Sequence, residues 1–154
     1  MPKSVNYFCL VFISIIFFVP AYATQNSITD ANIEVTVNYP EVVTHENEFV
    51  FSSIVKAKVD QISNITVTVA SPEIEILQNQ FHIENLPKDS TLGNNFNIKV
   101  REEAPQGAFL VNVSVEYFIK GFFDEKPVKN TLTKAVELNV QSIPILVLDA
   151  DAPD

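Results

Sequence analysis

The second part of the stretch 104–117, from Phe109 to Tyr117, alternates strictly between two kinds of side chain. The residues of one phase are Phe109, Val111, Val113, Val115 and Tyr117, and those of the other are Asn112, Ser114 and Glu116. A period of two with aromatic and β-branched residues is typical of a β-strand with one buried face. Pro105 and Gly107 precede this run and indicate the turn that leads into it. The strand needs an apolar core to pack on, so the neighbouring segments must supply one.

The same period of two recurs along most of the chain. The segments that show it are residues 33–39, 48–59, 64–70, 73–77, 81–83, 92–101, 108–119 and 130–140. Leu92, Phe96, Ile98 and Val100 share one phase and are predicted to point inward. Prolines fall between these segments or at their ends, where a sheet tolerates a missing N–H group. Seven to eight short strands with turn signals between them predict an all-β protein, an immunoglobulin-like (Ig-like) antiparallel β-sandwich over residues 31–141.

Residues 1–23 contain the three parts of a secretory signal peptide. Lys3 supplies the short positive region, residues 8–19 are apolar except for Ser14, and Ala21-Tyr22-Ala23 matches the small-x-small cleavage pattern. The alternative is an uncleaved membrane anchor, but the apolar run is shorter than the roughly 20 residues of a spanning helix. We therefore expect cleavage after Ala23 and export to the periplasm, the cell surface or the medium. The polar residues 24–30 are expected to form a flexible lead-in to the domain.

The composition excludes several classes of protein. The formal net charge is −9, and an acidic surface repels nucleic-acid phosphates. Cys9 is the only cysteine and lies in the leader, so the exported chain has neither a disulfide framework nor a thiolate metal site. No cofactor is predicted. Residues 142–154 form an acidic tail, and its apolar run from Ile143 to Leu148 is too short to span a bilayer.

The residues that could carry chemistry are few. His45 and His82 are the only histidines, and both are expected to be solvated, because a transition-metal site needs more ligands. The acidic clusters are Glu102-Glu103, Asp124-Glu125 and the tail residues Asp149, Asp151 and Asp154. The tail lacks the glycine turn and the final glutamate of a Ca²⁺ loop. The sequons at Asn64 and Asn112 are weak signals for glycosylation. We predict no catalytic residue and no enzyme activity.

The loop from Lys120 to Pro127 is the strongest candidate for a binding site. Phe122 and Phe123 are adjacent, so strand alternation cannot direct both into the core. One of them could anchor a partner, together with Asp124 and Glu125. The alternative is that both aromatic rings cap the end of the sandwich.

The order of segments resembles a family of prokaryotic surface modules. The residues that carry the likeness are 48–59, Asn64-Ile-Thr-Val-Thr-Val-Ala-Ser-Pro, the Leu86-Pro87 turn, and Glu103-Ala-Pro-Gln-Gly-Ala-Phe before the central strand. This arrangement resembles the Ig-like modules of cell-surface proteins, the CARDB and S-layer-associated adhesion-type domains. The likeness implies an Ig-like fold over residues 33–140 and an adhesive role, and it supplies no catalytic motif.

Three functions remain open from the sequence. The first is an exported, non-catalytic module that binds an envelope or extracellular protein, or a glycan, through loops or an unpaired sheet edge. The second is a small carbohydrate-active or hydrolytic accessory domain that uses surface carboxylates. The third is a structural spacer. An enzyme would need acids that converge in a concavity, whereas a binding module needs only an accessible face or edge.

Overall fold

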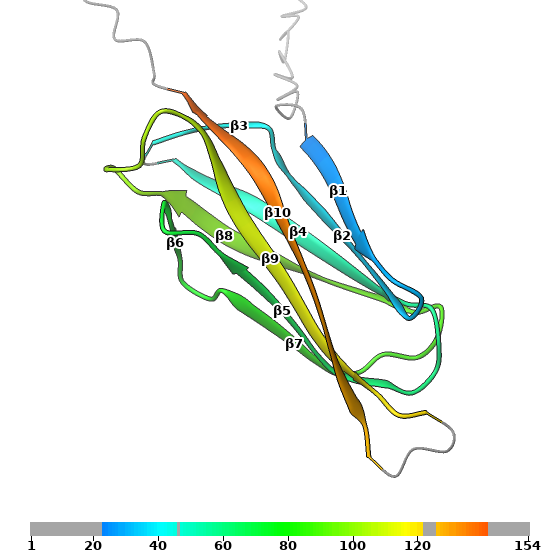
Figure 1. Cartoon of the computed structure of the whole chain (residues 1–154). Coiled ribbons are helices and arrows are strands. Elements are labelled where there is room, and N and C mark those ends of the chain that lie inside the picture. The colour runs from blue at the N-terminus through cyan, green and yellow to red at the C-terminus, as the bar shows by residue number, and fades with distance from the viewer. Residues whose placement is uncertain (1–22, 46, 122–125, 142–154) are drawn as a thin grey trace, which may run out of the picture.

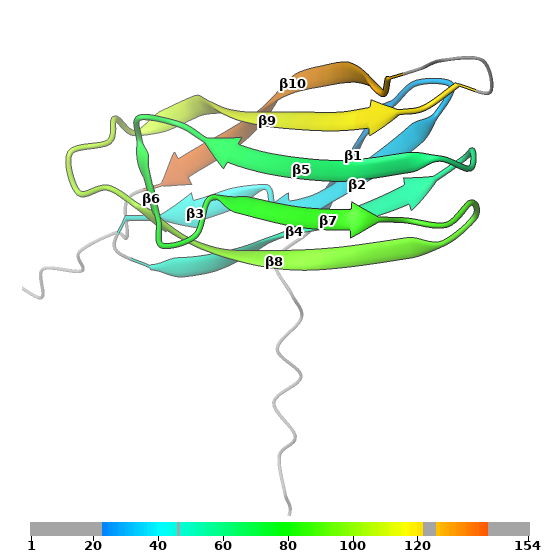
Figure 2. The ribbon, with the colours of Figure 1, turned by 90° about the horizontal axis from the view of Figure 1, so that it is seen from below.

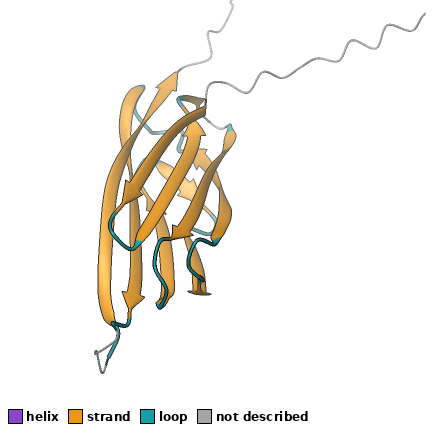
Figure 3. Ribbon diagram, turned by 90° about the vertical axis from the view of Figure 1, so that its right-hand side faces the viewer, coloured by secondary structure: helices purple, strands orange, loops and turns teal. Residues whose placement is uncertain are grey.

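Alternating side chains arrange the chain as two facing sheets of strands, and no helix occurs in the part that the structure describes (Figures 1 and 3). The structure is a computed structural model, and it describes residues 23–45, 47–121 and 126–141. The strands are β1 (Ala23–Thr29), β2 (Ile33–Pro40), β3 (Val42–Thr44), β4 (Glu48–Ala57), β5 (Ile62–Ala70), β6 (Ile74–Ile76), β7 (Gln80–Asn85), β8 (Thr91–Val100), β9 (Gly107–Ile119) and β10 (Val128–Gln141). The predicted all-β class is therefore confirmed.

The strand order is that of an Ig-like sandwich. The first sheet has the order β1-β2-β4-β8-β6, and the second has the order β3-β10-β9-β5-β7. With β2 and β4 as strands A and B, β8 and β6 take the places of E and D, and β10, β9 and β5 those of G, F and C. All pairs are antiparallel except β3 with β10. The predicted sandwich is confirmed, and the described residues form ten strands in place of seven or eight.

The two strands that the sequence did not predict are β1 and β3. Residues 24–30, expected to be a flexible lead-in, instead form most of β1, which pairs with β2 from Ala23↔Pro40 to Thr29↔Glu34. The lead-in prediction was wrong because only Ile28 of β1 is buried. An edge strand with one core residue shows almost no alternation in hydrophobicity. The predicted leader and the acidic tail lie outside the described residues, apart from Ala23.

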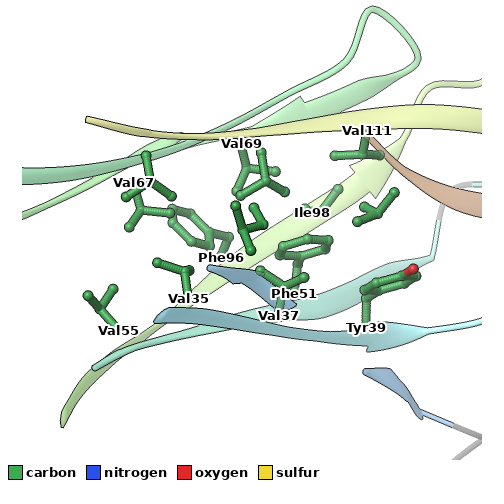
Figure 4. Packing of buried hydrophobic residues seen from close by; sticks show 14 of the residues in the cluster. Val35, Val37, Tyr39, Phe51, Val55, Val67, Val69, Phe96, Ile98 and Val111 are labelled. Carbon is green, nitrogen blue, oxygen red and sulfur yellow. The ribbon is translucent and has the colours of Figure 1, made fainter. Parts of the chain in front are cut away.

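The core lies between the sheets and is built from the inward phase of each strand (Figure 4). Phe109, Val111, Val113, Val115 and Tyr117 of β9 are all buried, as predicted. Tyr39 of β2 stacks on Phe51 of β4, with ring centroids 5.3 Å apart. Leu92 was predicted to point inward with Phe96, yet 45% of it is exposed. It lies near the start of β8, where the sheet edge has no neighbouring strand.

A polar cluster joins the two sheets beside the β1–β2 turn. The hydroxyl of Tyr117 donates to Asp30 Oδ2 and accepts from Asn32 Nδ2 at 3.1 Å. Asp30 Oδ1 accepts from the N–H groups of Asn32 (2.7 Å) and Ile33 (2.9 Å), and Lys58 Nζ donates to the Asp30 carbonyl at 2.9 Å. These bonds fix the β1–β2 turn of one sheet to the central strand of the other.

Candidate functional site

The free edge of β8 is the most distinctive feature of the described surface. On one side, β8 pairs with β4 from Thr91 to Lys99. On the other side, its partner is β6, which pairs only with residues 98–100. After Ile76 the chain leaves this sheet and crosses to β7 in the other layer (Figure 2). The edge of β8 from Thr91 to Asn97 therefore has no strand partner within the described residues.

Hydrogen bonds at the two ends of β8 show which backbone groups face this edge. The Arg101 N–H donates to Glu73 O on the β6 side at 2.9 Å. At the other end, Ser90 O accepts from the N–H of Ala57 on the β4 side at 3.2 Å. Because alternate residues of a strand bond to opposite sides, even-numbered residues pair with β4. The N–H and C=O groups of Thr91, Gly93, Asn95 and Asn97 point to the open side.

Side chains along this edge do little to block another strand. Natural edge strands are usually protected by charged residues, prolines or bulges. Residues 91–97 read Thr-Leu-Gly-Asn-Asn-Phe-Asn and contain no charge and no proline. Gly93 presents no side chain, and a Cβ atom there would lie 3.1 Å from Ser53 O and 3.5 Å from Ile54 Cγ1. A glycine within a strand is often found where another backbone approaches closely.

Two shallow hollows lie along the same edge. One, of about 260 Å³, is bounded by Ile76, Leu77 and Asn97, among others. Leu77 is the first residue after β6, and its side chain is 102% exposed. The other hollow, about 470 Å³, lies on the outer face beside Gly93 and Ile54. Ile54 is 43% exposed because the glycine next to it on β8 does not cover it. Apolar surface is therefore available beside the unpaired backbone groups.

The facing edge in the second sheet belongs to β7 and is more polar. The Val69 N–H donates to Asn79 O at 2.9 Å, so the odd-numbered residues of β7 bond to β5. The backbone groups of Gln80, His82 and Glu84 point outward, and all three residues are exposed. Ionisable residues thus lie within the β7 edge strand itself, whereas residues 91–97 of β8 include none.

The binding site predicted at Phe122, Phe123, Asp124 and Glu125 lies outside the described residues. The end of β9 and the start of β10, which flank it in the sequence, lie at one end of the sandwich (Figure 1). At its base, a hollow of about 430 Å³ is lined in part by Ile62 and Lys120.

The two histidines lie in different environments. His82 is exposed, as predicted, and its Nδ1 lies 3.1 Å from Thr66 Oγ1. The prediction for His45 was wrong, because its Nε2 lies 2.8 Å from the carbonyl oxygen of Ala104 and the residue is half-buried. His45 thereby connects the β3–β4 turn to the loop before β9. Its polar sequence neighbours concealed this contact, which joins residues 59 positions apart.

The described carboxylates do not converge on a catalytic or metal site. Glu103 lies 3.7 Å from Arg101, and both side chains are exposed, as is Glu102. Within the described ranges, no group of three His, Cys, Asp or Glu residues is placed to hold a metal ion. No helix in those ranges is long and apolar enough to cross a membrane.

Two groups of the polar cluster have shifted pKa values. Burial raises the pKa of Asp30, but hydrogen bonds from Tyr117 and the two backbone N–H groups, with the charge of Lys58, outweigh it and hold the pKa below its ordinary value. Burial and the bond to Asp30 raise the pKa of Tyr117. Tyr117 is 0% exposed, so no substrate reaches its hydroxyl. The cluster is a structural element.

Comparisons with known proteins give a fold likeness alone. No protein-family model matches the chain, and no curated protein matches it. Among solved structures, it is similar to the GAE domain of GGA2p from Saccharomyces cerevisiae, with a TM-score of 0.46 and 16% identity. The likeness covers 75% of this chain and 97% of that domain.

Proposed function

We propose that the chain is an exported, non-catalytic interaction module that binds a protein partner through the edge of β8. The observation that carries this proposal is the row of unpaired backbone groups at Thr91, Gly93 and Asn95. An extended segment of a partner can add to such an edge as a further strand, with backbone hydrogen bonds supplying affinity and side-chain contacts supplying specificity.

A protein partner fits this edge better than a glycan. Backbone N–H and C=O groups on an open strand match the repeat of another polypeptide backbone. The adjoining surface contributes Ile54 and Leu77, which are apolar and exposed. The leader-like residues 1–23 support export, and the resemblance to CARDB-type modules supports a place at the cell surface. The scattered described carboxylates support a non-catalytic role.

A pair of proline variants tests the proposal. Asn95→Pro removes an N–H that faces the open edge and places a ring there, while the bonds to β4 remain. Gln25→Pro is the matched control, because the Asp30 N–H bonds to Ile33 O and odd-numbered residues of β1 therefore face away from β2. Each variant, and the unaltered chain, is used for affinity capture in its own host, followed by mass spectrometry.

The expected result is a defined protein that the unaltered chain and Gln25→Pro retain and that Asn95→Pro loses. Circular dichroism melts establish that both variants fold. A partner retained equally by both folded variants would show that the β8 edge is not the binding site. Retention of a carbohydrate alone would contradict the choice of a protein partner.

A further inference from the structure

We propose that the open edge of β8 binds the apolar segment Ile143–Leu148 of a second copy of this chain. This inference rests on the proposed function, since it names the partner strand that the same edge receives. The segment reads Ile-Pro-Ile-Leu-Val-Leu and is followed by Asp149. These six residues carry no charge and are mostly β-branched or aliphatic, so an added strand suits them and they need a surface to cover them.

The segment of the same copy cannot lie along this edge over its full length. It begins two residues after Gln141, where β10 ends, and two residues span about 7 Å at most. In the sheet order, β10 is separated from β7 by three strand spacings, which amount to about 14 Å. The β8 edge lies further still, in the other sheet. A second copy carries no such restriction, so the contact is intermolecular.

Pro144 determines which side of the segment can face β8. Proline has no N–H and is tolerated in a sheet only where that position points away from a partner strand. The N–H groups of Ile145 and Val147 must then point to β8, opposite its odd-numbered residues.

The same phase sets the direction of the segment's side chains. Ile145 and Val147 lie on the outer face, beside Gly93 and the exposed Ile54. Leu146 and Leu148 point inward, on the same side as the half-exposed Leu92. Both faces of the segment thus find apolar surface that is exposed in the single chain.

We place the segment antiparallel to β8, the direction that β6 also has on this strand. In this direction, Asp149 and Asp151 come to the start of β8. Lys56 is opposite Thr91 in the register of β4 and β8. Lys88 and Asp89 lie in the turn just before β8. The side chains of Lys56, Lys88 and Asp89 are all exposed. A parallel strand would bring the two tail acids to the β6 end, where the exposed Glu75 has Lys99 opposite it in the β6–β8 register and Arg101 at 4.0 Å.

A synthetic peptide of residues 141–152 provides the direct test. The acceptor is the full chain carrying Val147→Pro, so that its own tail does not compete, and binding is measured by isothermal titration calorimetry. We expect the peptide to bind, and the Val147→Pro peptide to bind about tenfold or more weakly, because it loses an N–H that faces β8. A Leu148→Pro peptide is the matched control, since its proline faces away, and it should stay within about threefold.

Acceptor variants locate the site. Asn95→Pro in the acceptor should abolish peptide binding, and Gln25→Pro should leave it unchanged. The inference is overturned if the peptide fails to bind, if Gln25→Pro abolishes binding, or if the two proline peptides bind alike. Sedimentation velocity of the full chain gives an independent readout, because Val147→Pro should abolish self-association. Persistence of the dimer in that variant would instead indicate direct β8–β8 pairing and would also overturn the inference.

The two proposals fail in distinguishable ways. If Asn95→Pro loses a host protein but the peptide does not bind, the edge still binds a partner and only the identity of the strand is wrong. If Asn95→Pro retains every host protein and the peptide does not bind, both proposals are wrong.

Discussion

Side-chain hydrogen bonds connect the sheets along the side of the sandwich bounded by β1 and β10, whereas no such bond joins β7 to β8 among the described residues. On the first side, Lys134 Nζ donates to Ser27 O at 3.0 Å, and Tyr117 bonds to Asp30 and Asn32. The end of β10 is also covered by β3, over Asn139 to Gln141. On the second side, only three residues of β8 have a partner beyond β4.

The contrast shows that this protein protects one long side and leaves the other accessible. Both sides contain an edge strand with few charges, β1 and β8. Unprotected edges are aggregation hazards that natural proteins usually block. On β1, the Lys134 ammonium donates a hydrogen bond to the Ser27 carbonyl oxygen. Among the described residues, no charged side chain makes such a bond to residues 91–97. The open edge beside exposed apolar residues is the observation on which the proposed binding role rests.

The largest expected effect separates the two sides of β8 itself. Asn94→Pro removes a backbone hydrogen bond to β4 in the middle of a sheet, so the free energy of unfolding should fall by at least about 2 kcal/mol. Asn95→Pro alters only the open side and should cost less than about 1 kcal/mol. Urea denaturation measures both. Equal losses would mean that the phase assigned to the edge of β8 is wrong.

The next largest effect is expected from removing the Tyr117 hydroxyl, which forms hydrogen bonds between the two sheets. Tyr117→Phe keeps the buried ring but deprives Asp30 and Asn32 of their partner, and we expect a loss of about 1–3 kcal/mol. The raised pKa of Tyr117 adds a pH effect. Since the folded state favours the neutral phenol, its contribution is present below about pH 10 and is lost as the pH rises through the folded pKa. Thermal melts from pH 7 to 11 should therefore fall more steeply for the unaltered chain than for Tyr117→Phe.

The sequence predicts the core strands well because each has a buried and an exposed face. In β9, the five inward residues from Phe109 to Tyr117 are all buried. The same rule fails for β1, whose single buried residue is Ile28. It also fails for β3, which is only three residues long. Alternation reports burial, so an edge strand that buries little leaves almost no pattern.

The candidate site was predictable only as a possibility. An unpaired sheet edge was expected to bind, but no local pattern shows which strand it belongs to, because strand order depends on contacts between distant residues. Gly93 and the uncharged residues 91–97 were the available signals. Leu92 fitted the inward phase, and its exposure follows from the missing neighbour strand. The sequence could indicate which face of the strand a side chain lies on, but not whether a neighbouring strand buries it.

A smaller effect is expected for Asp30→Asn, and it depends on pH. The pKa of Asp30 is lowered in the folded state, so its charge stabilises the fold above the ordinary value of roughly pH 4 and ceases to do so as the pH falls through the folded pKa. At pH 7 the variant should lose about 1 kcal/mol. The difference from the unaltered chain should shrink toward zero near pH 2. Urea denaturation at both pH values tests this, and a difference that grows in acid would contradict the assigned sign.

The smallest effect is expected from a change at Lys134. Without its bond to β1, the side of the sandwich bounded by β1 and β10 would resemble the open side along β8. Lys134→Ala removes the bond to Ser27 O, and a partly exposed charged bond of this kind contributes about 0.5 kcal/mol. Amide hydrogen exchange should then quicken in β1, at Thr24, Asn26 and Ile28, because these residues depend on β2 alone. Lys129→Ala is the matched control, since Lys129 pairs with Glu116 at 2.8 Å on the outer surface of the other sheet. Unchanged exchange in β1 would mean that Lys134 does not protect this edge, and the contrast between the two sides would then depend on Tyr117 and β3.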